Sequence, residues 1–230
     1  MQKVKNLLKE QKIFLSLYFL LFAFSSTFLF SFSKAQLHIY TNQHYNSFFD
    51  HFFYYITNLG DGITCLTIGI LLLFYSIRSS CQVIITYAAS GIIVQILKRL
   101  FFSGTPRPKA YFEGLYDLRF VQGLEIHTNN SFPSGHAASA FALFLSLSII
   151  IKNKYLQVLF LVLAASTAFS RVYLSQHFLI DITFGSLISV LTTMTYYYLQ
   201  SNWKALWLDT KVNDYIGKRK KDSIDISNKS

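Results

Sequence analysis

The stretch SFPSGHAASAFALFLSLSIII, residues 131–151, decides the fold of this chain. From Gly135 to Ile151 it contains no acidic or basic side chain except His136 near its start. A helix needs about 20 apolar residues to cross the ~30 Å hydrocarbon core of a bilayer, and this run is close to that length. The stretch therefore predicts a membrane-spanning helix that begins just after a proline-containing loop.

The rest of the chain has the same apolar character. Its 230 residues are 52% hydrophobic and 17% aromatic, well above the usual content of a soluble domain. We therefore predict an all-α, polytopic membrane protein with six transmembrane helices in one membrane domain, residues 1–205, and a basic, partly disordered tail at 206–230. The predicted parts of the domain are a basic start at 1–12 and spans at 13–33, 62–77, 82–97, 135–151, 155–169 and 178–200.

The first apolar segment resembles a signal peptide. It follows several lysines and ends near the small-residue sequence Ser33-Lys34-Ala35. Its apolar part is longer than the ~7 to 15 residues that are typical of a signal peptide. We interpret it as the first membrane span.

The distribution of basic residues predicts the orientation. An even number of spans places both termini on the same side, and both terminal segments are rich in lysine and arginine. Such enrichment is typical of the cytoplasmic side. We interpret the net charge of +10 as this topology signal, together with attraction to anionic lipids at the cytoplasmic face, and not as a nucleic-acid-binding surface.

Two longer segments are predicted on the outer side. Residues 34–61 contain His44 and His51, which are seven positions apart and would share a face of one helix, where they could bind a metal. We favour an interfacial helix whose Phe and Tyr rings lie at the depth of the lipid head groups. Residues 98–134 contain all three prolines of the chain, which predicts a structured loop without regular helix.

Charged residues gather where the spans meet this outer side. Arg171 lies at the outer end of one predicted span, and His177 and Asp181 lie at the outer start of the next. Because His177 and Asp181 are four residues apart, the carboxylate can accept a hydrogen bond from one ring nitrogen and fix the tautomer. An aspartate facing lipid at this depth would cost up to ~2.5 to 3.5 kcal/mol, so Asp181 is predicted to face the bundle interior. On its own, the pair is equally consistent with a structural clamp between helices.

The start of the predicted span at 135–151 has the features of an anion site. Ser134, Gly135 and His136 form its first turn, where backbone N–H groups lack helical acceptors and the helix dipole favours negative charge. His136 alone would be read as an ordinary helix-end residue. The same outer side also has Lys98, Arg107, Arg171 and His177. The combination predicts a site for a tetrahedral oxyanion, which indicates phosphate.

These residues resemble the type 2 phosphatidic acid phosphatase family. The family pattern has three parts: a lysine followed by Arg-Pro, then Pro-Ser-Gly-His, then Ser-Arg, five residues, His, three residues and Asp. The second and third parts match residue for residue as Pro133-Ser134-Gly135-His136 and as Ser170-Arg171 followed by His177 and Asp181. With the six predicted spans, the resemblance covers about residues 13–200.

The first part of the pattern departs from the family. Eight residues separate Lys98 from Arg107, where the family has six, and Arg99 would leave seven. We assign Lys98, because it directly follows the helical run and because a loop rich in Pro and Gly absorbs an insertion easily.

The resemblance implies a role for each residue. His177 would be the nucleophile that forms a phosphohistidine, Asp181 would orient it, and His136 would be the general acid. The residues implied in phosphate binding are Lys98, Arg107, Ser134, Gly135 and Arg171. No cofactor or metal is implied, since one aspartate is too little for a carboxylate-held metal pair. A neutral nucleophile and a protonated acid together predict a bell-shaped pH dependence.

The resemblance also implies the class of substrate. A site at the extracytoplasmic rim fits a lipid phosphate, with lipid A phosphate and undecaprenyl diphosphate favoured equally, before phosphatidylglycerol phosphate and phosphatidic acid. The small six-span form resembles bacterial inner-membrane members with both termini cytoplasmic and a periplasmic site. The segment 110–128 is expected to shape the substrate choice through Tyr111, Phe112, Tyr116, Phe120 and His127.

Two alternatives remain for the function. The same motifs would serve a lipid phosphotransferase. A non-catalytic lipid-binding or transport protein would instead have charged residues at the midplane of its spans, where this sequence has none. No protein partner or oligomeric state follows from the sequence.

Overall fold

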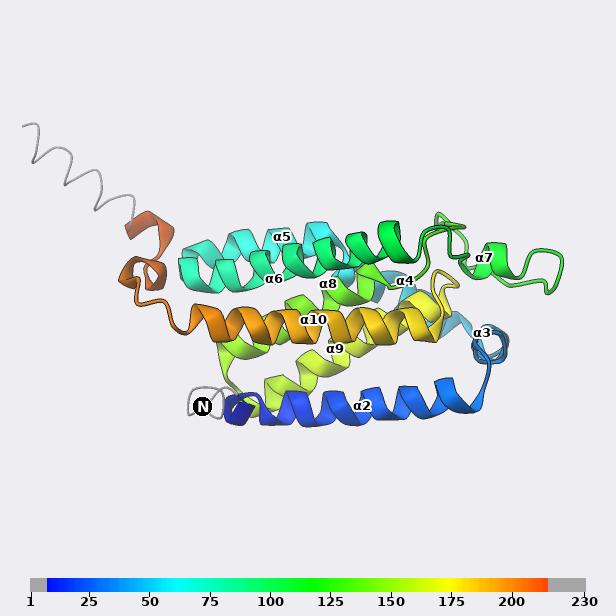
Figure 1. Cartoon of the computed structure of the whole chain (residues 1–230), viewed down its shortest axis with the longest axis horizontal. Coiled ribbons are helices and arrows are strands. Elements are labelled where there is room, and N and C mark those ends of the chain that lie inside the picture. Colours follow the sequence, from blue (N-terminus) through cyan, green and yellow to red (C-terminus); the bar gives the residue numbers. More distant parts are fainter. Residues whose placement is uncertain (1–7, 215–230) are drawn as a thin grey trace, which may run out of the picture.

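The computed structural model describes residues 8–214, and within them the chain is helical without a β-strand. The longer helices run side by side along one axis, and α3 and α7 lie at one end of the bundle (Figure 1). The helices are α2 (Lys12–Ser31), α3 (Lys34–Gln43), α4 (Ser47–Ile56), α5 (Gly62–Leu71), α6 (Ile77–Ile96), α7 (Pro108–Tyr111), α8 (Gly135–Ile151), α9 (Lys154–Tyr173) and α10 (Leu179–Gln200). Short 3-10 turns lie at Thr57–Gly60, Leu72–Phe74 and Leu206–Asp209, and a π-helical turn at Leu97–Phe101 continues α6.

Helix occupies each of the six apolar segments that were predicted to span the membrane, and the predicted all-α fold is confirmed for residues 8–214. By length and composition four helices in this part of the chain qualify as spans: α2, α6 with its π turn, α9 and α10. The pair Ser47–Gly60 and Gly62–Phe74, which bends by 56°, would make a fifth. The helix α8 has 17 residues and is shorter than a standard span.

The short helix α8 forms the centre of the bundle. It packs against α6, α9 and α10, and most of its side chains are buried. Its alanines at 137, 138, 140 and 142 are small, which lets neighbouring helices approach closely. The helix α10 approaches closely at Gly185, where an added Cβ would lie 2.3 Å from the carbonyl oxygen of Ser134. The starts of α8 and α10 are therefore held together at one end of the bundle.

The prediction that His44 and His51 share a face of one helix is wrong. The chain leaves α3 at His44, and the side chain of Asn46 accepts a hydrogen bond from the backbone N–H of Phe49 and so begins α4. The break puts His44 outside both helices, so it does not share a helical face with His51. Each ring instead bonds through Nδ1 to a backbone carbonyl four residues earlier.

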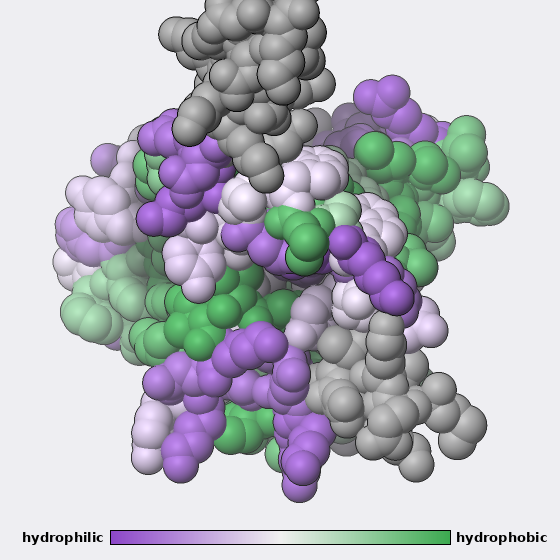
Figure 2. Space-filling view, turned by 90° about the vertical axis from the view of Figure 1, so that its left-hand side faces the viewer, coloured by the Kyte–Doolittle hydropathy of each residue, from purple (hydrophilic) through white to green (hydrophobic). Residues whose placement is uncertain are grey.

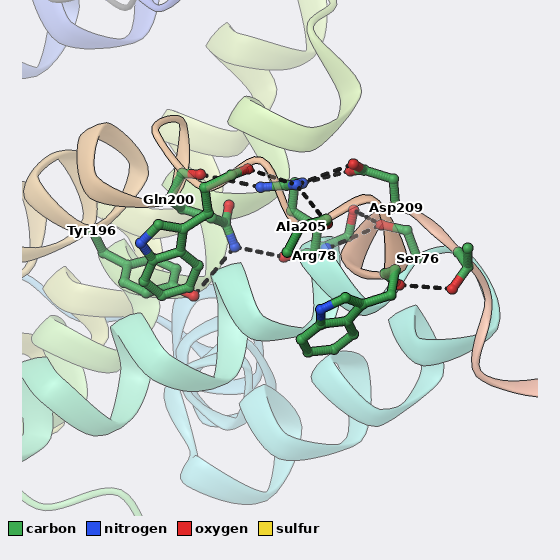
Figure 3. Close-up of polar contacts among 10 residues, drawn as sticks. Ser76, Arg78, Tyr196, Gln200, Ala205 and Asp209 are labelled. Atoms are coloured by element: carbon green, nitrogen blue, oxygen red, sulfur yellow. Dashed lines mark hydrogen bonds and ion pairs between the residues drawn. The ribbon is translucent and has the colours of Figure 1, made fainter. Parts of the chain in front are cut away.

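The opposite end of the bundle contains the first described residues and the first part of the predicted tail (Figure 1). Arg78 donates hydrogen bonds to the carboxylate of Asp209 and to the carbonyl oxygens of Gln200 and Ala205 (Figure 3). Gln200 in turn donates to the carbonyl of Arg78 and to the hydroxyl of Tyr196. The chain after α10 is thus folded back against the start of α6.

Figure 2 looks onto this end and shows hydrophilic side chains spread across it, with hydrophobic side chains between and behind them. The basic start predicted at residues 1–12 and the tail predicted at 206–230 fall largely at 1–7 and 215–230, outside the described residues.

Candidate active site

The end of α9 determines how Arg171 and His177 are placed. Ser175 has a left-handed backbone with φ of 54°. Its N–H donates to the carbonyl of Val172 at 3.0 Å, and the N–H of Gln176 donates to the carbonyl of Arg171 at 2.8 Å. These two bonds make a Schellman cap. The N–H of His177 donates to the same Arg171 carbonyl at 3.0 Å, so one predicted site residue holds the backbone of the other.

His177 and Asp181 form a buried pair at the start of α10. His177 Nδ1 lies 3.2 Å from Asp181 Oδ2, and each residue is only 2% exposed. The same carboxylate oxygen also accepts from the backbone N–H of Phe178 at 2.9 Å and from the Ser131 hydroxyl. With Nδ1 directed to the carboxylate, Nε2 of His177 has no hydrogen-bond partner among residues 8–214. The inward-facing arrangement that the sequence predicted is present.

The environment of His177 favours a neutral ring. Burial lowers the pKa of His177 below its ordinary value, and the hydrogen bond with Asp181 opposes that shift only in part. A neutral imidazole whose Nδ1–H points to a carboxylate has its lone pair on Nε2. The nitrogen available for attack on an electrophile is therefore Nε2.

The first turn of α8 provides free backbone donors. Ser134 caps the helix, because its hydroxyl accepts from the N–H of Ala137 at 3.3 Å, and its own N–H donates to the carbonyl of Asp181 at 2.9 Å. The N–H groups of Gly135 and His136 have no acceptor in the described part of the chain. They are the donors that an anion at this helix start would use.

His136 is engaged by the turn that precedes α5. Its Nε2 lies 3.2 Å from the hydroxyl of Thr57 and also bonds the Thr57 carbonyl, while Nδ1 lies 3.6 Å from Asp61. Thr57 also accepts a hydrogen bond from Arg171 Nη1 at 2.9 Å. An added Cβ on Gly60 would lie 2.6 Å from the ring of His136, so glycine leaves the space that the ring occupies.

The three predicted bases converge on the same place. Lys98 is buried in the π turn after α6 and interacts electrostatically with Arg107, Arg171 and Asp181. Arg99 is exposed and takes no part in this cluster, which favours the assignment of Lys98. Three cations near one buried carboxylate leave an excess of positive charge, and such an excess favours binding of an anion.

The two arginines differ in how fully their donors are used. Arg107 donates through Nε to the carbonyl of Asn129 at 2.9 Å and through Nη1 to the carbonyl of Gln176 at 3.3 Å. Arg171 bonds Thr57 through Nη1, but its buried Nε has no partner in the described structure. A ligand oxygen would satisfy that donor.

Three residues that contact the site were not predicted from the sequence. Ser131 bonds Asp181, Thr57 connects His136 to Arg171, and Gln176 bonds the carbonyl of Glu125 at 2.9 Å and so ties the long loop to the His177 segment. Ser131 and Gln176 are close in sequence to the motifs, which is a weak signal. Thr57 has no sequence signal at all.

The loop that was expected to shape the substrate choice is packed at the end of the bundle where α3 and α7 lie (Figure 1). Its aromatic residues Tyr111, Phe112, Tyr116 and Phe120 form a cluster with Phe178. His127 lies outside that cluster, and its Nδ1 is 3.8 Å from Glu125. No group of three His, Cys, Asp or Glu that could hold a metal is found within residues 8–214.

Several known proteins are similar to this chain in sequence or in fold. Residues 79–205, which include every predicted site residue, match the PAP2 superfamily. The structure is similar to that of LpxE from Aquifex aeolicus, with a TM-score of 0.62 and 25% identity over 72% of this chain and 94% of that one. It has the fold of a transmembrane PAP2-type phosphatidylglycerolphosphate phosphatase from Bacillus subtilis, with a TM-score of 0.62 and 19% identity over 86% and 98%. No curated protein matches the sequence.

Proposed function

The chain belongs to the PAP2 superfamily of membrane phosphatases, and on this premise we propose that it hydrolyses a lipid phosphomonoester or diphosphate through a phosphohistidine intermediate. The family resemblance predicted from the motifs is confirmed. The observation that carries the proposal is the free Nε2 of His177, whose Nδ1 is 3.2 Å from Asp181, beside the cluster of Lys98, Arg107 and Arg171.

The reaction proceeds in two steps. Nε2 of His177 attacks phosphorus, the bond from phosphorus to the leaving oxygen breaks, and His136 supplies a proton to that oxygen. Asp181 stabilises the positive charge that develops on the His177 ring. Water then cleaves the bond between nitrogen and phosphorus and releases phosphate. The three bases and the free N–H groups of the α8 start stabilise the phosphoryl oxygens in both steps.

A groove beside the site supports a lipid substrate. It has a volume of about 670 Å³ and lies along the outer part of α6 and the first turns of α8. Its lining includes Tyr87, Val94, Gln95, Arg99, Gly135 and Ser139. Because Gly135 belongs both to the groove and to the anion site, a lipid lying in the groove would bring its phosphate to the α8 start. The exposed Arg99 adds positive charge for an anionic head group.

Among the lipids, lipid A phosphate and undecaprenyl diphosphate stay favoured, followed by phosphatidylglycerol phosphate and phosphatidic acid. We propose that the protein lies in a bacterial inner membrane with cytoplasmic termini near anionic lipids and a periplasmic site. The described ends near residues 8 and 214 lie at the end of the bundle opposite α3 and α7, which supports this orientation (Figure 1).

A phosphate-release assay tests the proposal. The purified protein is given each of the four lipids in detergent, with and without EDTA, and free phosphate is measured. We expect release from at least one lipid, with a rate that EDTA does not change. Loss of activity with EDTA would overturn the metal-free mechanism, and transfer of labelled phosphate to an acceptor without release would favour a phosphotransferase.

A second experiment tests the orientation. Hydrolysis of a soluble analogue by intact spheroplasts, and not only by inverted vesicles, is expected from an outward-facing site.

Gly60→Ala is expected to lower kcat by ~10-fold to 100-fold, because a displacement of about 1 Å in a catalytic group has effects of this size. The added Cβ would lie 2.6 Å from His136 Cδ2 and 2.9 Å from Thr167 Cγ2, so the ring must move. The matched control is Gly69→Ala, whose Cβ would lie 2.5 Å from Ile84 Cγ1, at a crowded position between α5 and α6. Equal kcat values for both variants would show that the position of the His136 ring does not limit the reaction.

A further inference from the structure

A serine occupies the position in the α9 cap where glycine is usual. Ser175 is fully buried and has φ of 54°, a region that L-residues other than Asn and Asp rarely adopt. It lies two residues before His177. Glycine would fit this backbone without strain, so serine places a hydroxyl here at a conformational cost.

The hydroxyl of Ser175 has two partners, and both lie on α3. Asn42 donates to it through Nδ2 at 3.2 Å, and His38 Nε2 lies 3.2 Å from it. Asn42 is itself held by Arg119, whose N–H donates to Asn42 Oδ1 at 3.1 Å and whose carbonyl accepts from Nδ2 at 2.7 Å. A helix more than 130 positions earlier in the chain is thus bonded to the segment that contains the nucleophile.

His38 also contacts the residue that follows the nucleophile. Its ring centroid lies 5.3 Å from that of Phe178 in an edge-to-face arrangement and 5.7 Å from that of Phe112 in a stacked one. The N–H of Phe178 donates to Asp181. His38 therefore touches the chain on both sides of His177, at Ser175 and at Phe178.

His38 remains uncharged in this environment. It is 1% exposed, and burial lowers its pKa to about 4. The hydrogen bond with Ser175 is thus between neutral groups, and His38 adds no charge to the phosphate site. His38 can therefore affect the reaction only through the position of the residues that it contacts.

We propose that His38 and Asn42 of α3 are positioning residues that hold Ser175 and Phe178 and thereby direct Nε2 of His177 at the phosphate. The proposal rests on the proposed function, because it takes His177 as the nucleophile. Neither residue belongs to the three-part motif, and neither touches the cluster of bases. In Figure 1, α3 lies across the end of the bundle next to the start of α10, where such a contact is made.

The decisive variant is Ser175→Gly. Glycine relaxes the left-handed backbone but leaves His38 Nε2 without its partner, so the two effects oppose each other and the thermal midpoint is expected to change little. If the hydroxyl positions His177, kcat falls by ~10-fold to 100-fold with KM unchanged, as is usual when a supporting hydrogen bond behind a catalytic group is lost. His38→Phe keeps the ring packing without the hydrogen bond and is expected to lower kcat by no more than Ser175→Gly does, because the bond from Asn42 to Ser175 remains.

A double-mutant cycle tests the contact between Ser175 and His38. The double variant Ser175→Gly with His38→Phe is expected to lose no more kcat than Ser175→Gly alone, because that variant already removes the bond to His38. His38→Gln, whose amide reaches the place of Nε2, is expected to recover part of the loss. The matched control is His44→Phe, which changes an exposed histidine just past the end of the same helix.

Several outcomes would overturn the proposal. Wild-type kcat in Ser175→Gly and His38→Phe would do so, and so would full additivity in the double variant. Hydrogen exchange at the His177 amide, which bonds the Arg171 carbonyl, gives a readout that needs no activity. We expect faster exchange in His38→Phe, and an unchanged rate would also refute the role. An inactive wild-type protein with faster exchange in the variant would count against the proposed function and leave the positioning contact supported.

Discussion

Replacing His177 with alanine is expected to lower kcat for phosphate release by at least ~10³-fold, since removal of a nucleophile leaves only the contribution of binding and charge stabilisation. The ring is buried and its Nδ1 is bonded to Asp181, so Nε2 is the nitrogen that we propose attacks phosphorus. KM is expected to change little, because the phosphate is held by the bases and by the α8 start.

The measurement combines steady-state rates with trapping of the intermediate. After a brief reaction with labelled substrate and denaturation, the wild-type protein should retain label that acid releases and alkali does not, as expected of a phosphorus–nitrogen bond. His177→Ala should retain none. His51→Ala is the matched control, since His51 is exposed and its ring bonds the Ser47 carbonyl. Label on the alanine variant, or release at a tenth of the wild-type rate, would exclude His177 as the nucleophile.

The pairing of His177 with Asp181 was predictable from the sequence because it is local. Two residues four positions apart at the start of a helix share a face, and an aspartate at membrane depth requires a partner. The relation of Arg171 to His177 is different. It depends on a Schellman cap whose left-handed residue is Ser175, and without a glycine there the sequence has no signal for that turn. Their common outer side and the family resemblance predicted that these two residues belong to one site, but neither indicated the turn that joins them.

The end of α9 was also mispredicted, because it depends on contacts with other helices and not on the local sequence. The predicted span at 155–169 stopped before Ser170 and Arg171 because polar residues usually end an apolar run, yet α9 continues to Tyr173. The extra turn is possible because Ser170 bonds the Thr167 carbonyl and Arg171 bonds Thr57 inside the bundle. Burial of polar side chains by other helices is not visible in a hydropathy pattern.

The supporting residues that were not predicted from the sequence have one property in common. Each is a single polar side chain whose partner lies far away in the chain, as in the contacts of Thr57 with His136 and of Ser131 with Asp181. A serine or threonine in a loop has many ordinary explanations, and only the packing of helix ends brings it to the site. This is why the motif residues were predictable and their supporting residues were not.

Replacing His136 with alanine is expected to lower kcat by ~10²-fold to 10⁴-fold on a lipid phosphomonoester, because an alkoxide is a poor leaving group without a proton. On an aryl phosphate such as 4-nitrophenyl phosphate, whose leaving oxygen needs no proton, the loss should be much smaller. His136 also contacts the phosphate-binding residues indirectly. Its Nε2 bonds Thr57, which also accepts from Arg171, so the alanine variant disturbs phosphate binding as well.

Thr57→Val separates the two effects of His136. The variant removes the hydroxyl that bonds Arg171 Nη1 and His136 Nε2, but it leaves the imidazole rings of His136 and His177 in place. Because a loosened Arg171 weakens stabilisation of the phosphoryl group whatever the leaving group is, Thr57→Val should slow both substrates by the same factor. His136→Ala should instead slow the lipid far more than the aryl phosphate. Equal losses on both substrates in His136→Ala would mean that His136 acts through Thr57 and Arg171, and that the proton for the leaving group comes from elsewhere.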